Sequence, residues 1–115
     1  MSRGTSLGPH DQFMLEQWGR QLKEAFGNRP HLVGSVMRGG AYRDVDVRMV
    51  SPKRWLNQPN VRRAINLSVS LWGRQVTGLP IDFQFQSPDE FAAETGTTSA
   101  LGMMPAVWLN EGAKP

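Results

Sequence analysis

Three aspartates are the residues of this chain best suited to chemistry. Asp44 and Asp46 alternate with valines at the start of the run 44–50, and Asp82 lies in a second alternating run, 81–86. Side chains two residues apart on a strand leave the same face, so the carboxylates of Asp44 and Asp46 would lie roughly 6.5–7 Å apart along it. That span suits divalent ions about 3.5–4 Å apart.

Asp82 would complete this group if its strand lies beside the strand of Asp46. Each of the three acids occupies the polar phase of its run. Close carboxylates raise one another's pKa, and a bound cation would remove that repulsion. The chain has no cysteine, so a metal would be held by oxygen or imidazole, and carboxylates favour Mg²⁺ or Mn²⁺.

A Gly-Ser pair precedes the aspartates and adds features that suit a phosphate. Gly34 ends a short apolar run, where a missing side chain lets the backbone approach a ligand closely. The hydroxyl of Ser35 can contact a phosphate oxygen, and Gly39 and Gly40 allow the following turn to present backbone N–H groups to an anion. These residues together indicate chemistry on a metal-bound phosphate.

The order of predicted elements is helix, strand, strand, helix, strand, helix. We expect a helix over 11–26, strands over 31–36 and 44–50, one helical turn over 53–56, a helix over 60–77 and a strand over 81–86. A capping box at Ser87–Glu90 predicts a short helix from Pro88 to about Glu94. This order predicts an α+β fold with a small mixed sheet of three or more strands covered by helices.

Apolar stripes predict which helix faces are buried. The stripe of the first helix is Phe13, Met14, Trp18, Leu22, Ala25 and Phe26. The stripe of the second is Val61, Ile65, Val69, Trp72 and Val76, widened by Ala64, Leu67 and Leu71. Because so wide a stripe suits a helix laid across a sheet, we expect the second helix to cover the sheet and to hold the strand of Asp82 in place.

Length and composition limit the other function classes. The 115 residues fit one domain over 1–115, with a loose lead-in over 1–10 and an irregular apolar closing segment over 101–109. The net charge is only +3 and no basic run exceeds two residues, so we expect Arg62-Arg63 to be a solvated helix face and not a nucleic-acid grip. With neither an apolar run of the ~20 residues that cross a membrane nor a secretory signal, the chain is predicted to be cytoplasmic.

The motifs resemble those of the nucleotidyltransferase superfamily typified by DNA polymerase β, and especially its minimal one-domain members. The shared pattern is a strand-end Gly34-Ser35, then Arg38-Gly39, then Asp44-Val45-Asp46 in an apolar strand and Asp82 on a later strand. The resemblance covers about residues 11 to 90 and implies the same polymerase β palm-like core.

The resemblance also implies roles for single residues. Asp44 and Asp46 would hold two divalent ions, and Asp82 would complete the ion that activates the attacking hydroxyl. Gly34 and Ser35 would contact the triphosphate, with Arg38 as a further phosphate contact.

Two functions of different classes follow from this resemblance. The first is a Mg²⁺- or Mn²⁺-dependent enzyme that moves a nucleoside monophosphate from ATP or another NTP to a hydroxyl of a small molecule, a protein or an RNA end, releasing pyrophosphate. The alternative is a catalytically weak or inactive module of the same fold that binds a protein partner, as antitoxin-like family members do. The apolar, Met-rich character of the segment 96–115 motivates the second.

Overall fold

The elements form in the order that the sequence predicts, with one short strand added near the end. The computed structural model describes residues 7–39, 41–94 and 98–102. Its elements are α1 (Pro9–Phe26), β1 (Pro30–Val33), the 3₁₀ helix η1 (Gly34–Arg38), β2 (Val45–Val50), the 3₁₀ helix η2 (Arg54–Asn57), α2 (Pro59–Thr77), β3 (Ile81–Gln86), α3 (Pro88–Ala92) and β4 (Ser99–Ala100).

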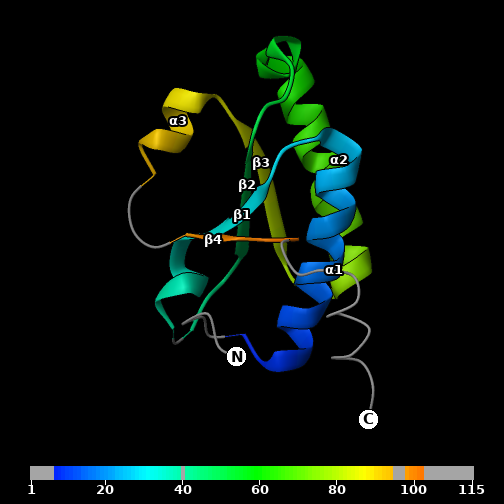
Figure 1. The fold of residues 1–115 in the computed structure, drawn as a ribbon, viewed down its shortest axis with the longest axis vertical. Helices are drawn as coiled ribbons and strands as arrows, with labels where there is room; N and C mark the ends of the chain where they lie inside the picture. The colour runs from blue at the N-terminus through cyan, green and yellow to red at the C-terminus, as the bar shows by residue number, and fades with distance from the viewer. Residues whose placement is uncertain (1–6, 40, 95–97, 103–115) are drawn as a thin grey trace.

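The four strands form one mixed sheet in the order β3-β2-β1-β4. β1 is antiparallel to β2 and β4, and β2 is parallel to β3. Figure 1 shows α1 and α2 on one side of this sheet and α3 with η1 on the other. The expected α+β class with a small mixed sheet is therefore confirmed.

The parallel pair β2–β3 is the part of the sheet that matters most for the candidate site. A parallel pair needs a crossover connection, and α2 provides it. The register pairs Val45 with Ile81 and Asp46 with Asp82. The strands carrying two of the predicted carboxylates are thus direct neighbours, as the sequence analysis required.

The buried faces of β2 and β3 form the centre of the core. Every second residue on these strands is essentially inaccessible to solvent: Val45, Val47, Met49, Ile81, Phe83 and Phe85. Trp18 of α1 packs edge-on against Trp72 and Phe83, with ring centroids 5.9 and 6.5 Å away. A Cβ on Gly73 would lie 2.6 Å from the Trp18 ring, so the missing side chain lets α2 approach that ring closely.

Polar side chains of α2 form hydrogen bonds with the backbone groups on the outer edge of β3. The Nε of Arg74 donates to the Ile81 carbonyl at 3.0 Å, Ser70 Oγ accepts from the Phe83 amide at 2.9 Å, and Asn66 Oδ1 accepts from the Phe85 amide at 2.9 Å. The spacing matches because four helical residues rise ~6 Å and two strand residues rise ~6.6 Å. The helix thereby covers an edge that would otherwise carry unpaired backbone groups.

This arrangement corrects the predicted burial of α2. Ala64, Leu67 and Leu71 do not widen the buried stripe; they are exposed, Leu67 by 60% and Leu71 by 51%. The physical reason is that the face carrying Asn66, Ser70 and Arg74 turns toward β3, which leaves the leucines on the outside. On α1, Leu15 is buried although the predicted stripe omitted it, and Ala25 is exposed.

Several element boundaries also differ from the prediction. β1 ends at Val33 instead of residue 36, because Gly34 has a φ of +76° that cannot continue a strand. α1 begins at Pro9, inside the predicted lead-in, since proline suits the first helical position. β2 begins at Val45, so Asp44 precedes the strand, and η2 lies one residue later than the predicted turn.

The remaining elements agree closely with the prediction. β3 spans 81–86 as predicted, and α2 starts one residue early, at Pro59. The capping box is present, with Glu90 N donating to Ser87 Oγ and Ser87 N donating to Glu90 Oε1, although α3 ends at Ala92 and not at Glu94. Most of the predicted closing segment and the segment 103–115 lie outside the described residues. None of the described helices is long and apolar enough to cross a membrane.

Candidate functional site

Asp46 and Asp82 form a pair of carboxylates on the polar face of the sheet. They are register partners on the parallel strands β2 and β3. Their side chains are 23% and 38% exposed, so both remain in contact with solvent. The alternation that buries Val45, Val47 and Phe83 is what turns these acids to the opposite face.

Arg48 is the counter-ion of this pair. It follows Asp46 by two residues and shares its face of β2; its Nη2 lies 3.7 Å from Asp46 Oδ1 and 3.6 Å from Asp82 Oδ2. Its Nη1 donates to the Asp82 carbonyl at 2.7 Å, and its Nε lies 4.0 Å from Glu94 Oε1. The side chain is only 12% exposed. Arg48 is therefore held in place by acids of β2 and β3 and by Glu94, which follows α3.

The pKa of the Asp46 carboxyl is raised above its ordinary value. Burial is the main cause, because it disfavours the ionised form. Arg48 opposes the rise, and the nearby acids Asp82 and Asp44 add to it. The raised pKa means that the ionised form of Asp46 is disfavoured. A second cation beside Asp46 would stabilise that form.

Gly34 packs against the Asp46 side chain. Its φ is +76°, and a Cβ built there would collide with Asp46 Oδ2. The absent side chain therefore brings the backbone at the start of η1 next to the carboxylate. The neighbour of Gly34 is thus a carboxylate of the chain itself, and the predicted contact of Gly34 with a phosphate stays a prediction.

The other predicted residues lie around this pair with fewer contacts. Asp44 is exposed just before β2 and is near enough to Asp46 to raise its pKa. Ser35 is half-buried inside η1, and Arg38 is exposed at the end of η1. Among the described residues, no ion pair joins Arg38 to the aspartates. Gly39 has a φ of +79°, and Gly40 lies outside the described residues.

The donor chemistry of the pair fits a hard divalent cation. In the described part of the chain, no three acids or histidines are grouped so as to hold a metal ion by themselves. Mg²⁺ is commonly held by one or two carboxylates together with oxygens of a bound phosphate, and not by an all-protein cage. Asp46 and Asp82 offer two carboxylates of this kind and would need further oxygen ligands from a bound phosphate or water.

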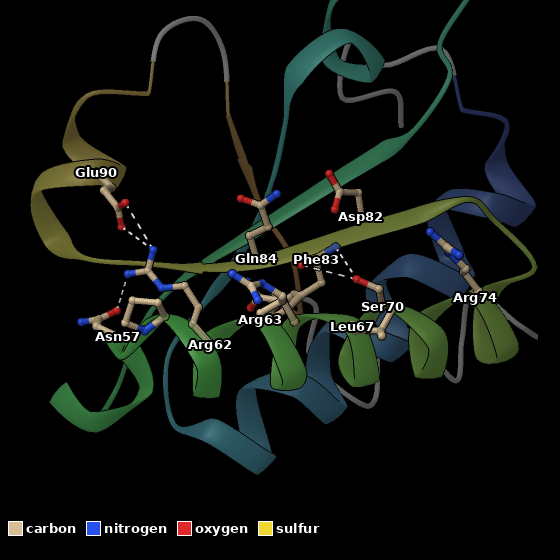
Figure 2. A pocket seen from close by; sticks show the side chains of 12 residues that line it. Asn57, Arg62, Arg63, Leu67, Ser70, Arg74, Asp82, Phe83, Gln84 and Glu90 are labelled. Carbon is tan, nitrogen blue, oxygen red and sulfur yellow. Dashed lines mark hydrogen bonds and ion pairs between the residues drawn. The ribbon is translucent and has the colours of Figure 1, made fainter.

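A cavity adjoins Asp82 on the outer side of β3. It has a volume of about 660 Å³ and lies between α2, β3, η2 and Glu90 of α3. Figure 2 shows Asp82 and Gln84 standing on one side of the β3 ribbon and the arginines of α2 on the other. Cavities of about 300–1,000 Å³ are typical of small-molecule sites.

Some residues of this region were not singled out from the sequence. Arg48 could have been found, since the period of two places it on the face of Asp46. Arg62 was expected to be a solvated residue, yet it is 23% exposed and pairs with Glu90 at 3.0 Å while donating to Asn57 Oδ1 at 2.6 Å. Its role depends on Glu90 of α3 coming within reach of α2, which no local pattern reveals.

Comparison of the chain with protein-family models, curated proteins and solved structures found no match. What the chain does must therefore be argued from its own residues and their geometry.

Proposed function

We propose that the chain is a metal-dependent nucleotidyltransferase. The observation that carries this proposal is the in-register pair Asp46 and Asp82 with the positive-φ residue Gly34 against it. The element order and the parallel β2–β3 pair also suit the polymerase β-like core that the motifs resemble. The reaction would transfer a nucleoside monophosphate from an NTP to an acceptor hydroxyl and release pyrophosphate.

Each residue has a definable part in this reaction. Asp46 and Asp82, assisted by Asp44, would hold Mg²⁺ or Mn²⁺, which supplies Lewis-acid stabilisation of charge on the phosphoryl oxygens. Gly34, whose backbone packs directly against the Asp46 carboxylate, and Ser35, one residue further along η1, would contact the triphosphate. Positioning of this kind supplies most of the catalysis in phosphoryl transfer, which needs little covalent help from the protein.

A second candidate is a binding module that has kept the fold without the activity. Arg48 already places a cation within 3.7 Å of both aspartates, which a purely structural ion-pair network would also contain. The exposed Leu67 and Leu71, four residues apart on α2, give an apolar surface on which a protein partner could pack. The two candidates differ in whether an NTP with metal binds.

Thermal shift and turnover measurements test the enzyme proposal. We expect Mg²⁺ with at least one NTP to raise the melting temperature, because a ligand that binds only the folded state stabilises it. Asp46→Asn or Asp82→Asn should abolish both this shift and metal-dependent turnover, and Asp89→Asn, an exposed acid of α3, should change neither. Full activity in the first two variants, or no shift with any of the four nucleotides, would contradict the mechanism.

A further inference from the structure

The cavity between α2 and β3 is lined by more positive than negative side chains. Three arginines of α2 line it, together with the acids Asp82 and Glu90. Glu90 forms an ion pair with Arg62 at 3.0 Å, and Asp82 forms an ion pair with Arg48 at 3.6 Å. Among the described residues, neither Arg63 nor Arg74 forms an ion pair.

Arg63 and Arg74 differ in how firmly their side chains are held. Arg74 is tied to β3 by the bond from its Nε to the Ile81 carbonyl, so its guanidinium is held at the end of the cavity near Asp82. Arg63 is exposed and lines the cavity further toward the start of α2. Figure 2 shows Arg63 lying between Arg62 and Phe83, below the strand. Arg63 is therefore the cation best placed to meet a ligand.

The cavity is an open groove, and an ion pair and a hydrogen bond join residues that line it. Arg62 of α2 bridges to Glu90 of α3 and to Asn57 of η2. The volume of about 660 Å³ agrees with a small molecule.

The distance between Arg63 and Asp82 sets the shape of the ligand. Arg74 bonds Ile81 and Ser70 bonds Phe83, so Asp82 lies level with about residue 72 of α2. Arg63 lies nine positions earlier, which is roughly 13–14 Å along the helix. A ligand with an anionic group at Arg63 can therefore place a second group, at its other end, beside Asp82.

We propose that this cavity binds a small phosphorylated alcohol, with the phosphate at Arg63 and a hydroxyl near Asp82. Guanidinium groups suit phosphate because their N–H donors match its oxygens in forked pairs. The identification of this ligand as the acceptor rests on the proposed function, because only then does Asp82 serve the attacking hydroxyl. The binding itself does not depend on metal or NTP.

The test is an NMR titration of the amide signals with ribose 5-phosphate, in the absence of metal and nucleotide. We expect saturable shifts at Asn66, Ser70 and Gln84, and no such shifts with ribose. Arg63→Gln should weaken binding by about tenfold, the loss expected for a charge-assisted hydrogen bond. Arg54→Gln removes an exposed arginine of η2 that does not line the cavity, and it should leave the affinity unchanged.

Other outcomes would overturn the assignment. Equal affinity of the wild type and Arg63→Gln for ribose 5-phosphate would place the phosphate elsewhere. Equal affinity of the wild type for ribose and ribose 5-phosphate would show that the phosphate charge does not contribute to binding. Tighter, Arg63-dependent binding of a 5′-phosphorylated trinucleotide without binding of ribose 5-phosphate would make the ligand a nucleic-acid end.

The Asp46→Asn variant separates this inference from the proposed function. It should still bind ribose 5-phosphate, because Asp46 does not line the cavity. Arg63-dependent binding without any NTP-dependent thermal shift would therefore overturn the nucleotidyltransferase proposal and leave the phosphate site standing.

Discussion

At the scale of single residues, Arg48 decides the charge balance of the carboxylate pair. It lies within 4 Å of Asp46, Asp82 and Glu94 and is mostly buried. Two acids that would repel each other are thereby held side by side. The same guanidinium must also oppose any divalent cation that the pair binds, since like charges at such distances repel.

Removal of this charge should strengthen metal binding. We expect Arg48→Gln to bind Mn²⁺ about fivefold more tightly than the wild type, as measured by electron paramagnetic resonance of free Mn²⁺. A fivefold change corresponds to ~1 kcal/mol, which is typical of two charges partly screened by solvent. Arg62→Gln is the matched control, because Arg62 pairs with Glu90 and not with the aspartates. Unchanged or weaker Mn²⁺ binding in Arg48→Gln would show that the pair does not hold the metal.

At the scale of secondary-structure elements, the contact between α2 and β3 holds Asp82 in register. Ser70 both accepts from the Phe83 amide at 2.9 Å and donates to its carbonyl at 3.4 Å, and it is buried. Asn66 and Arg74 repeat this contact one turn before and one turn after. The edge strand thus has its outward backbone groups satisfied by a helix and not by another strand.

Loss of this contact should destabilise the fold. Ser70→Ala leaves a buried amide without an acceptor, which costs about 1–3 kcal/mol. Ser68→Ala is a matched control on the same helix, because its Oγ is exposed and bonds only the Ala64 carbonyl of its own helix; we expect a change within about 0.5 kcal/mol. Urea unfolding measures both. Equal destabilisation by the two substitutions would show that the bond to β3 contributes nothing.

The same elements show what the sequence could predict. β3 was placed residue by residue because Ile81, Phe83 and Phe85 alternate strictly with polar residues, and one buried face determines that phase. The carboxylates of Asp46 and Asp82 were expected to lie close together if their strands were neighbours, but the register that pairs them was not predicted. The local period therefore determined the faces of the strands and not their register.

The remaining features depended on which elements pack together. Asn66, Ser70 and Arg74 recur every four residues, but this spacing indicates a contact with a strand only when the strand is known to lie beside the helix. The apolar pattern alone therefore assigned the exposed Leu67 and Leu71 wrongly to the core. The ion pair between Arg62 of α2 and Glu90 of α3 has no local signal in the sequence. Tertiary contacts therefore decide which residues line the cavity.

At the scale of the whole molecule, two acids make opposite contributions to the pH dependence of folding. Burial raises the pKa of Asp46 above 3.8, so the unfolded chain ionises first as pH rises and stability falls between 3.8 and the folded-state pKa. The hydrogen bond from the Ser87 amide lowers the pKa of Glu90 below 4.5. Its stabilising contribution is present above pH 4.5 and is lost as pH falls through the folded-state pKa.

Substitution of each acid by its amide should reveal these signs. Relative to wild type, we expect Asp46→Asn to be more stable at pH 7 and to lose that advantage as pH approaches 3.8. Glu90→Gln should be less stable at pH 7, with a deficit that shrinks below pH 4.5. Urea unfolding of the three proteins at several pH values between these limits measures both differences. A loss of stability at pH 7 in Asp46→Asn would mean that its pairing with Arg48 outweighs its burial, which would make the carboxylate pair a structural ion-pair network and favour the binding module over the enzyme.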